Sequence, residues 1–163
     1  ADQKDSRLDN LFNILYKLND DDEINRISSS IWEIWLETND IMIKEEFELG
    51  LDYMKNGQLK TSIQIFSKVI KKNPSFAEAW NKRATVLYMM GSYEQSQNDI
   101  NEVLKLEKRH FGALSGQGLI QTKLKNYKKA IKSYKEVQKI YPSMQVPKIM
   151  IPRLKDLIKD QSI

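Results

Sequence analysis

The chain has few side chains of the kinds that perform catalysis or hold metal ions. It has no cysteine, which excludes thiolate catalysis and thiolate zinc sites, and a single histidine, which excludes a histidine-rich metal site. We expect His110, in the link "EKRHFG", to cap or pack, with a general base as the alternative. The glycines of "SGQGL" (115–119) lie inside a predicted helix hairpin and form no phosphate loop. The sequence therefore predicts a non-catalytic protein with no metal site and no cofactor.

A 34-residue repeat positions every other residue of interest. Segments 43–76, 77–110 and 111–144 align without a gap. One column of the alignment holds small residues and another holds bulky ones: Gly50, Ala84 and Gly118, and Phe66, Ile100 and Tyr134. Small residues allow two helices to approach closely, and bulky residues four apart form an apolar stripe on each helix. Each segment therefore predicts a helix hairpin, which needs stacked neighbours because it cannot bury its apolar face alone.

The repeat resembles the tetratricopeptide repeat (TPR) family, whose motif runs Trp, Leu-Gly, Tyr, Ala, Phe, Ala and Pro. Several residues depart from that motif: Glu46 at the tryptophan, Arg83 and Gln117 at the leucine, Gln121 at the tyrosine and Lys108 at the proline. The resemblance implies an all-α solenoid of hairpins in a right-handed superhelix. It also implies that the concave face of the superhelix binds a peptide or a partner protein.

The two ends of the chain predict additional helices. Shifting the repeat backwards predicts a divergent hairpin within residues 1–42, with aromatic residues inside that could serve self-association. Residues 145–163 predict a capping helix, apolar at Ile151, Leu154 and Leu157. Pro147 and Pro152 leave the start of this helix open.

The predicted binding surface consists of three columns of the first helices, which we name the groove columns. Their members are Phe47, Asn81 and Ser115; Leu51, Thr85 and Leu119; and Met54, Tyr88 and Thr122. Apolar residues among amides and hydroxyls suit peptide recognition, although another part of the chain could cover them. A Lys and Asn clamp for a terminal carboxylate, found in some family members, is not expected. Phe47 and Leu51 replace its lysine and asparagine, and Gly112 and Gly116 replace its basic residues.

Arg83 is the most conspicuous misfit, because its column is normally buried between hairpins. A buried charge needs a partner, and we expect Arg83 to pair with Asp99 on its own hairpin or with Glu46 on the preceding one. The alternative is that Arg83 and Asn81 reach a ligand carboxylate. A related alternative function is binding of a small ligand in a pocket around Trp80, Asn81, Arg83 and His110.

Charge is distributed unevenly along the chain. Residues 1–42 carry 4 basic and 10 acidic residues, net −6, whereas residues 104–163 carry 14 and 4, net +10. The lysines of 128–139 share one helix face, which we expect to be solvated, and nucleic-acid binding is not expected. No segment is apolar enough for a membrane span.

Two features bear on location. The stretches "EAWNKRAT" and "KRHFGALSG" resemble short exported repeat proteins of alphaproteobacteria, which implies a periplasmic location. Ala1 in place of methionine suits signal-peptide cleavage and equally the boundary of an expressed fragment, so a cytoplasmic location stays open.

Overall fold

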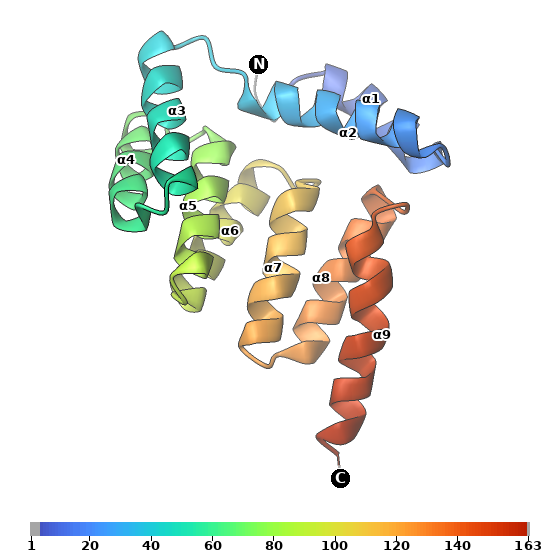
Figure 1. Cartoon of the computed structure of the whole chain (residues 1–163). Helices are drawn as coiled ribbons and strands as arrows, with labels where there is room; N and C mark the ends of the chain where they lie inside the picture. The colour runs from blue at the N-terminus through green and yellow to red at the C-terminus, as the bar shows by residue number, and fades with distance from the viewer. Residues whose placement is uncertain (1–3, 163) are drawn as a thin grey trace. The chain divides into compact units, whose positions relative to one another are not determined.

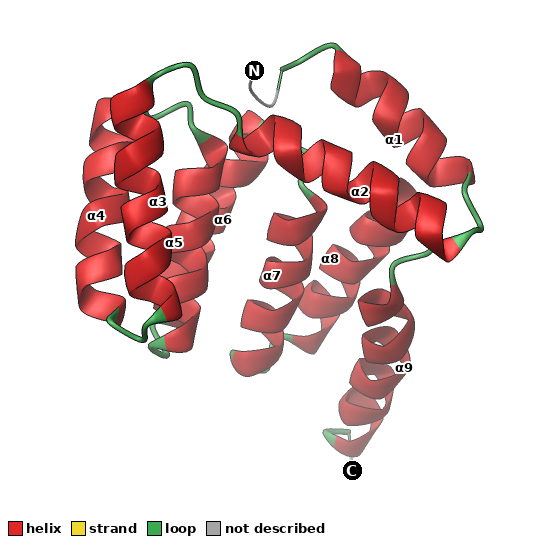
Figure 2. Ribbon diagram, turned by 45° about the horizontal axis from the view of Figure 1, so that its top comes forward, coloured by secondary structure: helices red, strands yellow, loops and turns green. Residues whose placement is uncertain are grey.

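The computed structural model describes residues 4–162, and in this range the chain forms nine helices and no strands (Figures 1 and 2). The chain divides into two compact units. The first comprises Trp32–Lys108 with the described residues before Ser6, and the second comprises Ser6–Ile31 and residues 109–162. Within the described part, no helix has the length and apolar character needed to cross a membrane. The predicted all-α fold class is confirmed.

The first unit contains two of the three predicted hairpins. They are formed by α3 (Ile41–Lys55) with α4 (Leu59–Lys72), and by α5 (Ala77–Met89) with α6 (Tyr93–Leu106). Helix α4 also packs against α5, which stacks one hairpin on the other. The apolar stripes meet in one core: Ile43, Phe47, Phe66, Val69, Ile70, Phe76, Ala79 and Val86.

The second unit contains the third hairpin, α7 (Phe111–Lys123) with α8 (Tyr127–Ile140), and the C-terminal helix α9 (Gln145–Asp160). Helix α9 packs against α8 and α7 and begins before both prolines. Pro147 lies in the first turn, where backbone N–H groups have no helical partner, so it is tolerated there. Ile151 and Leu154 are buried, but Leu157 is 40% exposed, so this predicted apolar position is not part of the core.

Two N-terminal helices, α1 (Arg7–Lys17) and α2 (Asp21–Leu36), fall within the segment expected to hold a divergent hairpin. Helix α1 packs against α8. The Phe12 ring lies 6.3 Å from that of Phe111, and Arg109 Nη1 lies 2.7 Å from Asp9 Oδ1. Aromatic packing and an ion pair thus attach α1 to the second unit. The assignment of residues 1–42 as a separate domain stays a prediction.

The three hairpin turns share one backbone conformation. Gly57, Gly91 and Lys125 occupy the same column of the repeat, with φ angles of 75°, 78° and 60°. In each turn, the next residue donates its N–H to a carbonyl of the last helical turn, as in Gln58 N to Tyr53 O at 2.9 Å. The predicted end of the first helices at Gly57 and Gly91 is confirmed. Lys125 adopts the left-handed conformation without the freedom of glycine.

The small-residue column brings the two helices of a hairpin together, as predicted. A Cβ atom added at Gly50 would lie 2.6 Å from the Phe66 ring, and one at Gly118 would lie 2.4 Å from the Tyr134 ring. In the middle hairpin, Ser96 Oγ donates across the same interface to the Ala84 carbonyl at 2.7 Å. Glycine is therefore required where the facing side chain is aromatic.

Candidate functional site

Arg83 forms a two-pronged ion pair inside the first unit. Its Nε and Nη2 atoms each donate to one oxygen of Asp99 at 2.7 Å, and Nη1 donates to Ser67 Oγ at 3.0 Å. The Asp99 side chain is 5% exposed and that of Arg83 20% exposed. Paired, parallel hydrogen bonds of this kind are among the stronger charged contacts. The predicted pairing of Arg83 with Asp99 is confirmed.

The alternative pairing of Arg83 with Glu46 is wrong. Glu46 instead accepts from Lys72 Nζ at 2.6 Å, across the hairpin of α3 and α4. Arg83 borders a cavity of about 360 Å³, whose other lining residues come mostly from the second helices α4 and α6: Ile63, Leu87, Gln95, Asn98 and Asp99. Most of these residues lie outside the predicted groove columns.

A neutral version of this pair occurs 34 residues later. Gln117 Nε2 donates to Ser133 Oγ at 2.7 Å, and Ser133 Oγ donates to the Lys129 carbonyl at 3.2 Å. Gln117 and Ser133 occupy the columns of Arg83 and Asp99. The motif leucine position is therefore a polar link between the two helices in both hairpins.

The groove columns of the first unit are largely closed. Phe47 is 4% exposed, with its ring 5.0 Å from that of Phe76, and Asn81 is 7% exposed and donates to Glu78 Oε2 at 3.5 Å. Leu51 and Met54 are partly buried against the same core. Phe47 and Asn81 therefore do not present their side chains at the surface, because Phe76 at the start of α5 and the buried Glu78 engage them.

The two remaining groove columns residues of the first unit lie on α5. Thr85 is exposed, and its hydroxyl donates to the Asn81 carbonyl at 3.0 Å. The half-buried Tyr88 ring lies 5.4 Å from that of Tyr93. Both side chains make contacts within their own hairpin, which leaves little unsatisfied apolar surface for a partner.

The groove columns of the second unit are more open. Leu119 is 40% exposed. Ser115 and Thr122 are half-buried, and their hydroxyls donate to Met144 Sδ at 3.5 Å and to the Gly118 carbonyl at 2.7 Å. The Ser115 contact shows that this face of α7 lies toward the start of α9.

Helix α9 continues the groove columns, which the sequence interpretation missed by treating it only as a cap. The 34-residue frame places Ile149 after Ser115 and Arg153 after Leu119. Val146, Ile149 and Leu157 are 39%, 55% and 40% exposed. With Arg153 they follow spacings of 3, 4 and 4, so they share one helix face. We name Leu119, Val146, Ile149, Arg153 and Leu157 the groove strip. Extending the repeat frame past residue 144 would have identified it.

The residues of the expected small-ligand pocket have structural contacts of their own. The Trp80 indole donates to the Pro74 carbonyl at 2.9 Å, and its ring centroid lies 5.2 Å from Arg83 Cζ. His110, in the second unit, is fully buried and its Nδ1 accepts from Ala113 N at 3.0 Å, which caps α7. His110 therefore caps a helix, as expected. Its ring gives no support to the general-base alternative.

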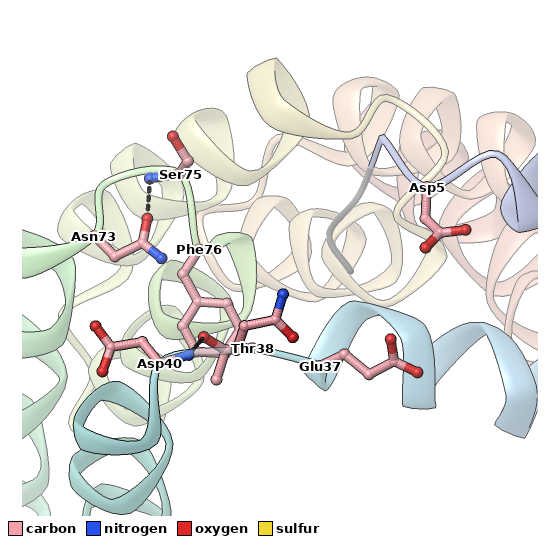
Figure 3. A pocket seen from close by; sticks show the side chains of 8 residues that line it. Asp5, Glu37, Thr38, Asp40, Asn73, Ser75 and Phe76 are labelled. Atoms are coloured by element: carbon pink, nitrogen blue, oxygen red, sulfur yellow. Dashed lines mark hydrogen bonds between the residues drawn. The ribbon is translucent and has the colours of Figure 1, made fainter.

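An acidic cavity of about 460 Å³ lies in the first unit, near the starts of α3 and α5 (Figure 3). Asp40 Oδ1 accepts from the backbone N–H of Met42 and Ile43, and Asn73 Oδ1 accepts from Ser75 N at 3.2 Å. These polar groups cap a helix and close a turn. Among the residues that the structure describes, no group of three acidic or histidine side chains could hold a metal ion.

Comparisons with known proteins agree with this architecture. Residues 50–91 match the family described as "TPR repeat", and residues 81–144 match the family described as "Tetratricopeptide repeat". A TPR repeat-containing protein of Rhizobium etli is 32% identical over 137 residues, which is 84% of this chain and 67% of that protein. Hsp70-Hsp90 organizing protein 3 of Arabidopsis thaliana is 28% identical over 63% of this chain, but the match spans only 18% of that protein.

Solved TPR structures share the fold at low sequence identity. The first TPR of Spaghetti (RPAP3) bound to the HSP90 peptide SRMEEVD has a TM-score of 0.70 and 19% identity, covering 72% of this chain and 93% of that one. The crystal structure of MamA protein has a TM-score of 0.67 and 19% identity, covering 70% and 62%. The repeat period, the hairpins and these similarities lead to one conclusion. The chain belongs to the tetratricopeptide repeat family.

Proposed function

We propose that the chain is a non-catalytic module that binds a peptide or partner protein, and that the groove strip of α7 and α9 is its binding surface. The observation that carries this proposal is the exposure of four large apolar side chains on two helices that contact each other: Leu119, Val146, Ile149 and Leu157. A cluster of exposed apolar residues on a stable helix pair is typical of an interaction site.

The contrast with the first unit supports the choice of surface. There, two of the six groove columns residues are buried in the core or against Glu78, and two more pack partly on that core. In the second unit, Gly112 and Gly116 carry no side chains that could cover the same face of α7. A partner would therefore gain more apolar contact from the groove strip.

The charges around the groove strip suggest which peptides it accepts. Arg153 lies within the apolar stripe of α9, and Lys123 and Lys148 are exposed on the two helices. Peptides with apolar residues and a nearby acidic side chain would complement this arrangement. A TPR domain of similar fold was solved with the peptide SRMEEVD, which is consistent with this class of ligand. The absence of the Lys and Asn clamp residues in this chain argues against recognition through a terminal carboxylate.

The test is selection of peptides from a random displayed library on the whole chain, followed by affinity measurements by fluorescence anisotropy. Two variants form a matched pair, because Ile149 and Met89 are both 55% exposed and lie in different units. Ile149→Glu should weaken binding by about tenfold or more, since it places a carboxylate against apolar groups. Met89→Glu should change the affinity by less than about twofold.

Circular dichroism of both variants controls for folding, since exposed positions should leave helicity unchanged. Failure to enrich any peptide would contradict the proposal. So would a selected peptide whose affinity falls in Met89→Glu and stays unchanged in Ile149→Glu.

A further inference from the structure

Helix α3 presents an exposed face that no described part of the chain covers. Ile41, Met42 and Leu49 are 70%, 69% and 47% exposed. Glu45, Glu48 and Asp52 are exposed on the same side of the helix, given the spacing of these six residues. The face is therefore apolar and acidic.

The exposure of Leu49 is the reverse of what its position predicts. Leu49 keeps the motif leucine, and 34 residues later Arg83 replaces it. Yet Leu49 is 47% exposed, whereas the Arg83 side chain is only 20% exposed because Ser67 of α4 and Asp99 of α6 contact it. Terminal repeats of a solenoid usually have a polar outer face. An apolar outer face at this position indicates a surface that becomes covered in an assembly.

We infer that a second copy of this chain covers this face, with α3 of one copy docked against the groove strip of the other. This inference rests on the proposed function of the groove strip and names its partner. The apolar residues Ile41, Met42 and Leu49 would pack on the strip's apolar residues. The acidic side chains of α3 would lie near Arg153.

Charge favours this pairing over α3 with α3 or α9 with α9. Helix α3 carries four acidic and two basic residues, net −2, and α9 carries four basic and two acidic residues, net +2. Contacts between unlike helices attract, whereas contacts between like helices repel. The two surfaces differ, so the contact is head-to-tail, and each copy keeps one free surface to bind another.

The first test is the mass of the protein in solution, measured by sedimentation velocity over a range of protein and salt concentrations. Wild-type protein should form larger species as its concentration rises, and these should dissociate in high salt because salt screens exposed charges. A monomer under all these conditions would overturn the inference.

Two variants then test the head-to-tail arrangement. Leu49→Lys disrupts the α3 face and keeps the groove strip, whereas Ile149→Glu does the opposite. Each variant alone should be monomeric, and an equimolar mixture should form a discrete dimer that grows no further, because one native contact remains. Association of Ile149→Glu by itself, or a mixture that stays monomeric, would overturn the inference. Met89→Lys, at an exposed apolar position on α5, is the control and should associate like wild type.

Peptide binding by the same proteins separates failure of this inference from failure of the proposed function. Leu49→Lys should bind a selected peptide with wild-type affinity, since Leu49 lies outside the groove strip. If wild-type protein is monomeric but Ile149→Glu loses peptide affinity, only the inference fails. If peptide affinity is unchanged in Ile149→Glu, the proposed function fails as well.

Discussion

The hairpin of α5 and α6 and the hairpin of α7 and α8 join their helices differently at the same two positions. The first uses the ion pair of Arg83 with Asp99, and the second uses the neutral hydrogen bond from Gln117 to Ser133. A third solution exists in the hairpin of α3 and α4, where Leu49 and Ile65 are both apolar. The position thus tolerates any complementary pair of residues, but it does not tolerate half of a pair.

The comparison also places Arg83 among structural residues. Its donor groups engage Asp99 and Ser67, and its guanidinium lies beside the Trp80 ring. A buried ion pair adds little net stability compared with apolar residues of similar size, but losing one partner is costly. The ion pair is therefore a fixed link between hairpins more than a source of binding energy.

The largest expected effect comes from breaking the ion pair. Asp99→Ala should lower the free energy of unfolding by about 3 kcal/mol, because it leaves the Arg83 charge largely buried without its partner. Urea denaturation followed by circular dichroism measures this loss. The double variant Arg83→Leu with Asp99→Ile, which copies the first hairpin, should recover most of it. A double variant as unstable as the single one would show that the ion pair is irreplaceable.

An intermediate effect is expected where the two hairpins differ in the small-residue column. Ala84 is accommodated in the middle hairpin, but Gly118 faces the fully buried Tyr134 ring. Gly118→Ala should therefore lower the free energy of unfolding by about 2 kcal/mol through overpacking. Adding Tyr134→Ile, as at Ile100 of the middle hairpin, should relieve this strain. An unchanged urea midpoint in Gly118→Ala alone would mean that the helices can move apart at little cost.

The smallest effect concerns the turns. Gly91 and Lys125 have the same left-handed conformation in the two hairpins, and only Lys125 has a Cβ atom that disfavours it. Lys125→Gly should raise the free energy of unfolding by roughly 0.5 kcal/mol, the gain in the folded state being partly offset by the greater freedom of glycine in the unfolded chain. Gly91→Lys is the converse control and should destabilise. A loss of stability in Lys125→Gly would indicate that the lysine side chain makes a stabilising contact.

Features that repeat every 34 residues could be predicted from the sequence. The three hairpins, the glycines that end their first helices and the close approach at Gly50 and Gly118 all follow from the repeat. The pairing of Arg83 with Asp99 could also be predicted, because a buried charge needs a partner and Asp99 lies on the adjoining helix.

Features that depend on contacts outside the repeat could not be predicted. Burial of Phe47 depends on the Phe76 ring, and burial of Asn81 brings it to Glu78, neither of which belongs to the groove columns. The packing of α1 against α8 joins segments far apart in the sequence. The openness of the groove strip was missed for a different reason, since α9 was interpreted by its prolines and not by its place in the repeat.

The central claim, that the groove strip is the binding surface, is tested most directly by hydrogen–deuterium exchange of the wild-type chain with and without a selected peptide. Bound peptide should slow exchange of backbone amides in α7 and α9, because ligand binding opposes local opening of the helices it contacts. Helices α3 and α5, whose groove columns are mostly closed, should exchange at nearly the same rate in both states. Protection confined to α3 and α5, with none in α7 and α9, would contradict the claim.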